Sequence, residues 1–287
     1  MEKPKTKLEF AVQMTCQSCV QAIERCLQGI KGVQAVQVSL DSESVLVETT
    51  LTAEEVQNLL ESTGRLAVLK GMGGSIERDL GAAVTMMEGA NCIQGVVRFV
   101  QVSEDKCIVE GTIDGLRPGL HGLHVHAFGD LTDSFRKCGD HFNPQMNSHG
   151  GPQDPDRHAG DLGNILVDET GRAHFRMEDD RLKVWDIIGR SLVVDEVEDD
   201  LGRGEHPLSK ITGNSGESED HSPEKKHPNL KYKEQLRSKL LTLEKNWPEE
   251  SSLVQPASLR TLNSSVHVTE RHFGTSVTEP EATQDAG

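Results

Sequence analysis

Up to about residue 70, the chain changes repeatedly between runs of two-residue period and runs of helical period. Alternation of apolar and polar side chains is typical of half-buried strands, and apolar spacings of three and four are typical of helices. The predicted elements are a strand at 8–12, a helix at 19–28, strands at 33–40 and 44–49, a helix from 52 and a strand at 66–69. This part of the chain therefore predicts a strand–helix–strand–strand–helix–strand unit.

The ends of this unit carry their own signals. Thr52 and Glu55 are spaced as a capping box, which predicts the start of the second helix. The βαββαβ order predicts a ferredoxin-like arrangement. We place this domain at residues 7–71 and a linker at 72–79, because the Gly-Met-Gly-Gly-Ser stretch that starts at Gly71 predicts a flexible joint.

From residue 80 the pattern changes to short strands that are separated by turn signals, such as Asp-Gly at 114–115 and Thr-Gly at 170–171. Many short strands with such turns are typical of an antiparallel sandwich or barrel. The predicted strands are 82–86, 93–100, 107–113, 120–126, 173–177 and 191–195. The fold class is therefore α+β, with a second domain at residues 80–216.

Residues 217–287 form a tail that is rich in Glu, Lys, Ser and Pro and contains no cysteine. This composition predicts a largely disordered segment. Two short patterns depart from it: one set of apolar residues shares a helical face and predicts a marginal helix, and residues 265–269 alternate as a poor strand does. The residues on the helical face are Tyr232, Leu236, Leu240, Leu243 and Trp247.

The net charge of the 287-residue chain is −16, which argues against a general binder of nucleic acids or acidic membranes. No apolar run approaches the roughly 18 residues of a membrane span, and residues 1–5 lack the apolar core of a signal peptide. Six cysteines suit a reducing compartment better than a disulfide scaffold. We therefore expect a soluble protein of the cytoplasm.

Two cysteines, Cys16 and Cys19, follow the first predicted strand, and Cys19 opens the first helix. A helix N-terminus favours thiolate over thiol, and two thiolates at this spacing can hold one soft ion such as Cu(I). On spacing alone, three other interpretations stay open: a thioredoxin-like redox pair, half of a zinc site, and two core cysteines.

The residues around this pair narrow the alternatives. Residues 14–19 resemble the M-x-C-x-x-C motif of small copper-carrier domains, and the resemblance extends over residues 8–70. It implies a heavy-metal-associated domain that holds Cu(I) between its two motif cysteines. Cys26, seven residues beyond Cys19 on the predicted helix, is interpreted as a core residue rather than a third ligand.

The second domain contains a cluster of candidate ligands: His124, His126, His141, His149, His158 and Asp161. The first two are alternate residues of one predicted strand and therefore point the same way. The other four follow in a long loop rich in Gly and Pro. Such a loop needs something to order it, and three histidines with one aspartate form an ordinary tetrahedral zinc set. Surface histidines without a metal are the alternative.

These ligands lie in motifs that resemble the copper/zinc superoxide dismutases. The matching stretches are residues 119–126, 141–144, 149–152, 157–164 and 199–204. The resemblance implies a Greek-key β-barrel with Zn(II) held by His141, His149, His158 and Asp161. It also implies that His124 and His126 belong to a copper site that His141 bridges to the zinc, and that Asp199 links the two sites.

One position departs from the dismutase pattern. Asp195 stands where the enzymes have a fourth copper histidine, and a carboxylate is a poorer ligand for Cu(I) than imidazole. We therefore expect the copper site at His124 and His126 to be vestigial, the zinc site to be structural, and the protein to be a metallochaperone rather than an enzyme. A weak dismutase stays open as an alternative.

A copper-carrier domain joined to a dismutase-like domain resembles the family of copper chaperones for superoxide dismutase. The resemblance implies delivery of Cu(I) to a copper/zinc superoxide dismutase subunit, which the second domain binds as a heterodimer through residues 128–132 and 188–190. A homodimer is the alternative assembly. Family resemblance adds the nucleus and the mitochondrial intermembrane space to the expected locations.

The resemblance ends after Gly216. The family continues with a strand that closes the barrel and with a C-x-C copper segment, and neither is present. The subloop disulfide is lost too, because Phe135 replaces one cysteine and the other belonged to the missing strand, which leaves Cys138 without an evident partner. We expect an incomplete barrel with two open edges. A docking-competent but transfer-deficient variant, acting as a copper buffer or decoy, stays open.

Overall fold

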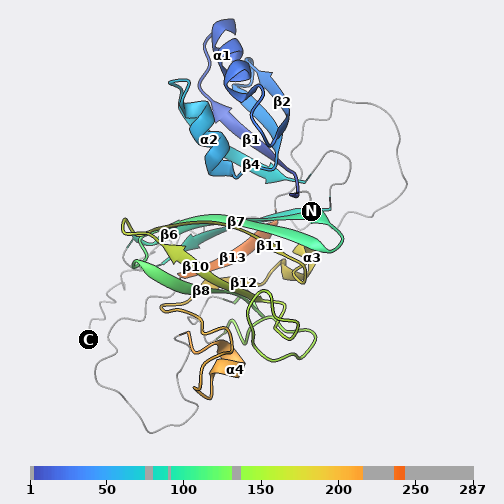
Figure 1. Ribbon diagram of the computed structural model, residues 1–287, viewed down its shortest axis with the longest axis vertical. Coiled ribbons are helices and arrows are strands. Elements are labelled where there is room, and N and C mark those ends of the chain that lie inside the picture. Colours follow the sequence, from blue (N-terminus) through green and yellow to red (C-terminus); the bar gives the residue numbers. More distant parts are fainter. Residues whose placement is uncertain (1–2, 75–79, 90–91, 131–136, 216–235, 243–287) are drawn as a thin grey trace, which may run out of the picture. The chain divides into compact units, whose positions relative to one another are not determined.

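The computed structural model describes residues 3–74, 80–89, 92–130, 137–215 and 236–242, the last range by its backbone. Residues 6–73 form a four-stranded antiparallel sheet with two helices (Figure 1). The elements are β1 Thr6–Val12, α1 Gln17–Leu27, β2 Val33–Ser39, β3 Ser44–Thr49, α2 Ala53–Glu61 and β4 Ala67–Gly73. The sheet order is β2-β3-β1-β4, which confirms the predicted ferredoxin-like unit.

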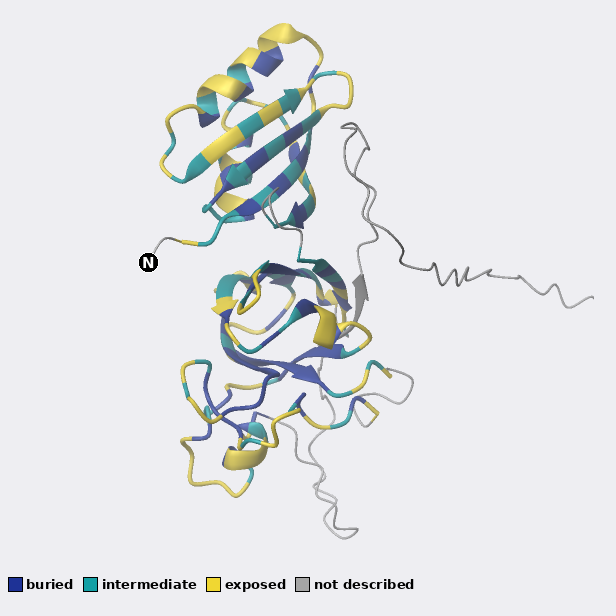
Figure 2. Cartoon of the chain, turned by 90° about the vertical axis from the view of Figure 1, so that its right-hand side faces the viewer, coloured by how far each residue is buried: buried dark blue, intermediate teal, exposed yellow. Residues whose placement is uncertain are grey.

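Apolar periodicity explains how this unit packs. Alternate residues of β1 and β3 are buried, and α1 and α2 each bury one face (Figure 2). Burial of these side chains removes apolar surface from water and is the main driving force for folding the unit. The buried residues of the two helices are Cys19, Val20, Ile23, Leu27, Ala53, Val56 and Leu60.

The predicted start of the second helix is confirmed, whereas the last strand of the unit ends later than predicted. The capping box is confirmed, because the Glu55 N–H donates to the Thr52 hydroxyl and the Thr52 N–H donates to the Glu55 carboxylate at 2.8 Å. β4 extends through Gly73, into the stretch whose composition predicts a flexible joint. It does so because Lys7 of β1 pairs with Gly73 in the sheet.

The second domain is an antiparallel barrel, and residues 82–194 provide seven of its strands. These are β5 Ala82–Glu88, β6 Gln94–Ser103, β7 Lys106–Asp114, β8 Gly119–His126, β10 Asp161–Val167, β11 Arg172–Asp179 and β12 Ser191–Val194. Two short helices, α3 Val184–Ile187 and α4 Ser209–Thr212, lie in the connections. The α+β class is confirmed, and β10 is a strand that the periodicity did not predict.

The tail provides the eighth strand. β13, Leu236–Thr242, pairs with β12 on one side and with β5 on the other, and closes the barrel in the order β10-β11-β7-β6-β5-β13-β12-β8. The expectation of two open edges is corrected: seven strands leave a gap, and β13 fills it.

The helix predicted in the tail is wrong at Leu236 and Leu240, which lie in β13. A strand is favoured over a helix there because it pairs with the edges of β5 and β12, which a helix would leave unpaired. The other residues of the predicted helical face, and the weak strand at 265–269, lie outside the described residues.

The connections after β8 and β12 position the candidate site. Aliphatic side chains such as Val97, Val109 and Leu123 fill the barrel interior. Residues 137–160 and 195–215 bring buried polar side chains against the barrel wall. None of the described helices has the length and hydropathy needed to cross a membrane.

Candidate metal centres

Cys16 and Cys19 bring their sulfur atoms together at the start of α1. The two Sγ atoms are 3.6 Å apart, and Cys16 is the N-cap residue of the helix. Cys16 is exposed, whereas Cys19 is 9% exposed. The Cys26 thiol donates to the Ile23 carbonyl at 3.1 Å, so it does not join the pair. The pair can hold one soft cation that stays accessible from the Cys16 side.

Hydrogen bonds around the pair favour its thiolate forms. A backbone hydrogen bond from Thr15, then one from the Arg65 guanidinium, lower the pKa of Cys19 to about 6. The Ser18 hydroxyl lies 3.0 Å from Cys16 Sγ and lowers the pKa of that thiol. The pair therefore carries negative charge near neutral pH, which attracts a cation.

Arg65 is a site residue that the sequence analysis missed. It precedes β4, and the Gln13 N–H donates to the neighbouring Leu66 carbonyl at 3.2 Å, which brings this segment beside the cysteine loop. Pairing of β1 with β4 creates this proximity. A basic residue directly before a strand that neighbours β1 is the signal that could have found it.

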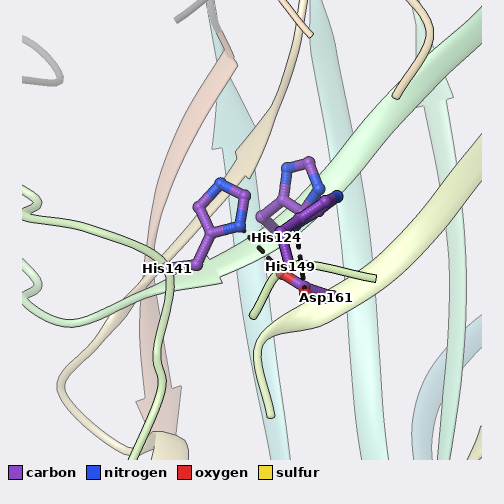
Figure 3. Close-up of side chains that lie close together, drawn as sticks. All are labelled: His124, His141, His149 and Asp161. Carbon is purple, nitrogen blue, oxygen red and sulfur yellow. Dashed lines mark hydrogen bonds and ion pairs between the residues drawn. The ribbon is translucent and has the colours of Figure 1, made fainter. Parts of the chain in front are cut away.

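In the barrel, three histidines converge on the carboxylate of Asp161. Its oxygens lie 2.8 Å from Nδ1 of His141, 3.1 Å from Nδ1 of His149 and 3.1 Å from Nδ1 of His158. All four residues are buried. Figure 3 shows His141 and His149 turned toward Asp161. Ligand atoms around a tetrahedral zinc ion, with bonds of about 2.0–2.1 Å, are about 3.3 Å apart, so the separation of each histidine nitrogen from Asp161 is close to that expected around one ion.

The charge of Asp161 suits this assignment. Burial favours the neutral carboxylic acid, but hydrogen bonds from the three histidines outweigh burial and lower the pKa of Asp161. A buried carboxylate among imidazoles is a donor set typical of zinc. The donor atoms that all lie within 4.8 Å of one another are those of His124, His141, His149 and Asp161, so His158 contacts Asp161 but lies outside this set. Both nitrogens of His124 face other carboxylates, those of Asp195 and Asp199.

Arg157 fixes the loop that carries His158 and Asp161. Its side chain is 1% exposed, and Nη2 lies 2.6 Å from Asp179 of β11. Nη1 donates to the His158 carbonyl at 3.2 Å and to the Asp161 carbonyl at 3.0 Å. A buried guanidinium persists only where such partners surround it, so this contact holds two of the candidate zinc ligands in place through their backbone.

His124 lies between two carboxylates. Its Nδ1 is 2.9 Å from Asp195 and its Nε2 is 2.9 Å from Asp199. Burial opposes a charged imidazole, but Asp195 and then Asp199 outweigh burial and hold the pKa of His124 well above its ordinary value. Both ring nitrogens of His124, which the dismutase resemblance places in the copper site, therefore face carboxylate oxygens in this structure.

The other members of that site lie nearby. His126 Nδ1 donates to the Gly139 carbonyl at 2.8 Å. His141 stacks on His124 with ring centroids 4.0 Å apart, and its buried Nε2 has no hydrogen-bond partner among the described residues. Asp199 reaches both centres, because its second oxygen lies 2.9 Å from Nε2 of His149. Asp199 therefore contacts one histidine of each candidate site, which is the linking position that the sequence analysis expects.

Ser215 is a second residue that the sequence analysis missed. Its hydroxyl donates to the Asp195 carboxylate at 2.5 Å, and both residues are buried. The hydrogen bond adds to the ion pair of Asp195 with His124. Only the fold, which returns the chain after α4 to the end of β12, brings the serine to this place.

The two predicted docking segments lie side by side. The Ser191 hydroxyl donates to the Phe128 carbonyl at 2.7 Å, and a Cβ at Gly129 would collide with the carbonyl oxygen of Gly189. Leu131 and Thr132 lie outside the described residues. Large apolar side chains around this contact are exposed: Phe128 61%, Trp185 53% and Ile188 39%. This surface can bind a complementary apolar surface.

Comparison with known proteins gives matches to both domains. The heavy-metal-associated domain family matches residues 9–65, and the copper/zinc superoxide dismutase (SODC) family matches residues 93–219. The copper chaperone for superoxide dismutase of Homo sapiens is 67% identical over 210 residues, which are 73% of this chain and 77% of that protein. The chaperone of the same name from Rattus norvegicus is 68% identical over 209 residues, 73% of this chain and 76% of that protein.

The barrel also has relatives among the enzymes. Superoxide dismutase (Cu-Zn) 2 of Brassica juncea is 45% identical over 140 residues, which are 48% of this chain and 92% of that protein. The ion pair of Asp195 with His124 thus lies in a domain that is similar to an enzyme as well as to the chaperones.

Proposed function

Because this chain belongs to the copper chaperones for superoxide dismutase, we propose that Cys16 and Cys19 carry Cu(I) as cargo and that the barrel binds the dismutase subunit that receives it. The chain is a metallochaperone rather than an enzyme, as the names of its relatives state. The observation that carries the proposal is the pair of sulfurs 3.6 Å apart at a helix N-terminus.

The chemistry of the pair selects Cu(I). Thiolates are soft ligands, and soft ligands prefer Cu(I) to the hard cations of the cell. The low pKa of Cys19, about 6, provides a thiolate at neutral pH without a base. Exposure of Cys16 leaves one side of the bound ion open to an incoming ligand from the recipient.

Copper titration tests this assignment. We expect the protein to bind one Cu(I) under anaerobic conditions, and Cys16→Ser or Cys19→Ser to abolish that binding. Cys26→Ser is the matched control, because Cys26 lies on the same helix but donates to the Ile23 carbonyl, and it should retain the copper. Retention of Cu(I) by both motif variants would refute the proposal.

We assign Zn(II) to His141, His149, His158 and Asp161, because Nδ1 of each histidine lies 2.8–3.1 Å from an oxygen of Asp161. A bound zinc ion supplies a fixed double positive charge that balances the buried Asp161 carboxylate. The ligands come from the loop after β8 and from the start of β10, so the ion would join these segments. Its role here is structural.

We propose that the barrel docks on a dismutase subunit as a heterodimer, through the surface around Phe128 and Ile188. The exposed apolar side chains there support it, and a homodimer through the same surface is the competing assembly. We expect Ile188→Asp to weaken the complex with copper-free dismutase at least about tenfold, because a charge would enter an apolar contact. Leu166→Asp, at an exposed leucine of β10, is the control and should bind normally.

The binding assay also separates the alternatives. Loss of self-association, rather than of dismutase binding, in the Ile188→Asp variant would favour the homodimer. All six cysteines are free thiols, which suits the reducing cytoplasm as the place of action. Fractionation of cells that express the tagged full chain tests this location against the nucleus and the mitochondrial intermembrane space.

A further inference from the structure

The two cysteines of the candidate copper site differ in how freely they can move. Cys16 is the N-cap residue of α1, with φ −164° and ψ 168°, so its backbone is extended and precedes the helix. Its sulfur makes no capping hydrogen bond to the helix, and the residue is exposed. Cys16 can therefore turn its sulfur away from the pair without disturbing the helix or the core.

Cys19, in contrast, lies inside the first turn of α1. Its N–H donates to the Cys16 carbonyl at 2.9 Å. Its side chain belongs to the same buried apolar cluster as Met14, Val20 and Ile23. Turning this sulfur outward would expose apolar surface to water, which is unfavourable. Cys19 is thus the anchored sulfur of the pair, and Cys16 is the movable one.

The hydroxyl groups around the pair are also arranged unequally. Ser18 Oγ lies 3.0 Å from Cys16 Sγ. Thr15 Oγ1 is further from both sulfurs, at 4.0 Å from Cys16 Sγ and 3.8 Å from Cys19 Sγ. Ser18 is exposed in the first turn of α1. The closest of these hydroxyl contacts therefore joins an exposed serine to the movable sulfur.

We propose that Ser18 is a positioning residue for copper transfer: its hydroxyl makes Cys16 the sulfur that releases the cargo first, while Cys19 keeps hold of the ion until the recipient has bound it. This inference rests on the proposed function, because it takes Cu(I) as the cargo of the two cysteines. It adds the order in which the sulfurs leave the ion and the residue that sets this order.

Release of Cys16 is a ligand exchange without a redox step. A donor atom of the recipient, either a thiolate sulfur or an imidazole nitrogen, gives a lone pair to the Cu(I) ion, and the bond between copper and Cys16 breaks. Both electrons of that bond stay on the Cys16 sulfur, which leaves as a thiolate. Copper remains in the +1 state, so the exchange needs neither an oxidant nor a reductant.

The hydrogen bond from Ser18 favours this exchange. A hydroxyl donates a stronger hydrogen bond to a free thiolate than to a sulfur that shares its charge with a metal ion, because hydrogen bonds to ionised acceptors are the stronger ones. The Ser18 hydroxyl therefore stabilises Cys16 more after it has left the copper than before. An interaction that strengthens along the exchange lowers its barrier.

The rate of copper release from the full chain tests the role of Ser18. The protein is loaded with one Cu(I) under anaerobic conditions and mixed with bicinchoninate, a chelator whose Cu(I) complex is coloured. We expect Ser18→Ala to slow the release at least about threefold, because part of one charge-assisted hydrogen bond is lost. Ser18→Thr keeps a hydroxyl at this position and should release copper at close to the rate of the unmodified protein.

Ser42→Ala is the matched control for this measurement. Ser42 lies in the turn between β2 and β3, and its hydroxyl contacts those of Ser39 and Ser44 rather than a sulfur. It should leave the release rate unchanged. Equal rates for Ser18→Ala and Ser42→Ala would overturn the inference and leave the copper assignment intact. Failure of the unmodified protein to take up Cu(I) would instead refute the proposed function, and this inference with it.

Alkylation of the copper-loaded protein tests the order of release directly. A limiting amount of iodoacetamide, enough to modify about one molecule in ten, reacts with whichever sulfur is momentarily free of copper. We expect the label at Cys16 to exceed that at Cys19 at least about tenfold, as read from the fragment masses of the peptide that contains both. In Ser18→Ala the labelling of Cys16 should fall. Equal labelling of both cysteines, or more label at Cys19, would contradict the proposed order.

Discussion

Oδ2 of Asp195 lies 2.9 Å from Nδ1 of His124, inside a barrel whose relatives include a copper/zinc dismutase. The pair is buried, and Asp199 holds the other ring nitrogen at the same distance. Both ring nitrogens of His124 thus face carboxylate oxygens. The domain is similar to a dismutase, but two carboxylates contact one of the histidines that match copper ligands.

Replacing Asp195 should reopen the copper site. In Asp195→His the ion pair with His124 is lost, and an imidazole that can bind both copper states takes its place. We expect the barrel to gain about one copper ion and superoxide dismutation to rise clearly above that of the unmodified protein. Measurements of copper content and dismutation on copper-loaded protein check this.

Asp195→Asn is the control for charge alone. It removes the carboxylate charge but adds no imidazole, so the pKa of His124 should fall while dismutation stays low. If the unmodified protein already shows strong dismutation that His124→Ala abolishes, the protein is an enzyme and this account of the barrel fails.

Arg65 should control the reactivity of Cys19. Its guanidinium contributes, after the Thr15 backbone, to the low pKa of that thiol, about 6. In Arg65→Gln we expect the pKa to rise; a rise of about one unit would reduce the thiolate fraction at pH 7 from about nine-tenths to about one-half. The rate of alkylation of Cys19 against pH, in metal-free protein, measures this.

Arg25→Gln is the matched control, since Arg25 lies on α1 and bonds to the Gln21 carbonyl rather than to a sulfur. An unchanged alkylation profile in the Arg65 variant would show that Arg65 does not lower the pKa of Cys19.

Cys107 should make stability fall at alkaline pH. Burial, and then the charge of Asp179, raise the pKa of this thiol to about 12, whereas an unfolded cysteine ionises near about 8.5. Stability is therefore complete below about pH 8.5 and decreases as the pH rises toward 12, because only the unfolded chain ionises. Denaturant unfolding between pH 8 and 11 should show a shallower decrease in Cys107→Ala than in the unmodified protein.

Thiol labelling gives a second reading of the same environment. At pH 8 we expect Cys107 to react only after unfolding, whereas the exposed Cys92 reacts in the native protein. Labelling of Cys107 at the native rate of Cys92 would contradict its burial.

Removal of zinc should destabilise the barrel. Binding to the folded state alone adds about 4 kcal/mol when the free metal exceeds its dissociation constant about a thousandfold. We expect chelation, His149→Ala and Asp161→Ala each to lower the melting temperature of the barrel and to remove one zinc. His206→Ala, at an exposed histidine of the loop after β12, should keep both. Full zinc content in the Asp161 variant would disprove the assignment.

Local patterns predicted much of this fold because the signals in question act within a few residues. The Thr52 capping box and the buried face of α1 follow from spacings of three and four, and both are confirmed. The motif residues His141, His149, His158 and Asp161 were likewise found from the sequence, and the fold brings them together around one carboxylate.

The remaining features depend on contacts between distant parts of the chain. Leu236 and Leu240 are four residues apart, a spacing that fits one face of a helix and also one face of a strand. Free edges of β5 and β12 decide between these, and they arise only when the barrel forms. Two other contacts also form only when distant parts of the chain come together: the ion pair of His124 with Asp195 and the approach of Arg65 to Cys19.

The buried guanidinium of Arg157 donates hydrogen bonds to the main-chain carbonyls of His158 and Asp161 and not to their side chains. These hydrogen bonds do not involve an ion, so they position the backbone of both candidate ligands before a metal binds. Because this part of the backbone is already fixed, the chain loses little further conformational entropy when an ion binds.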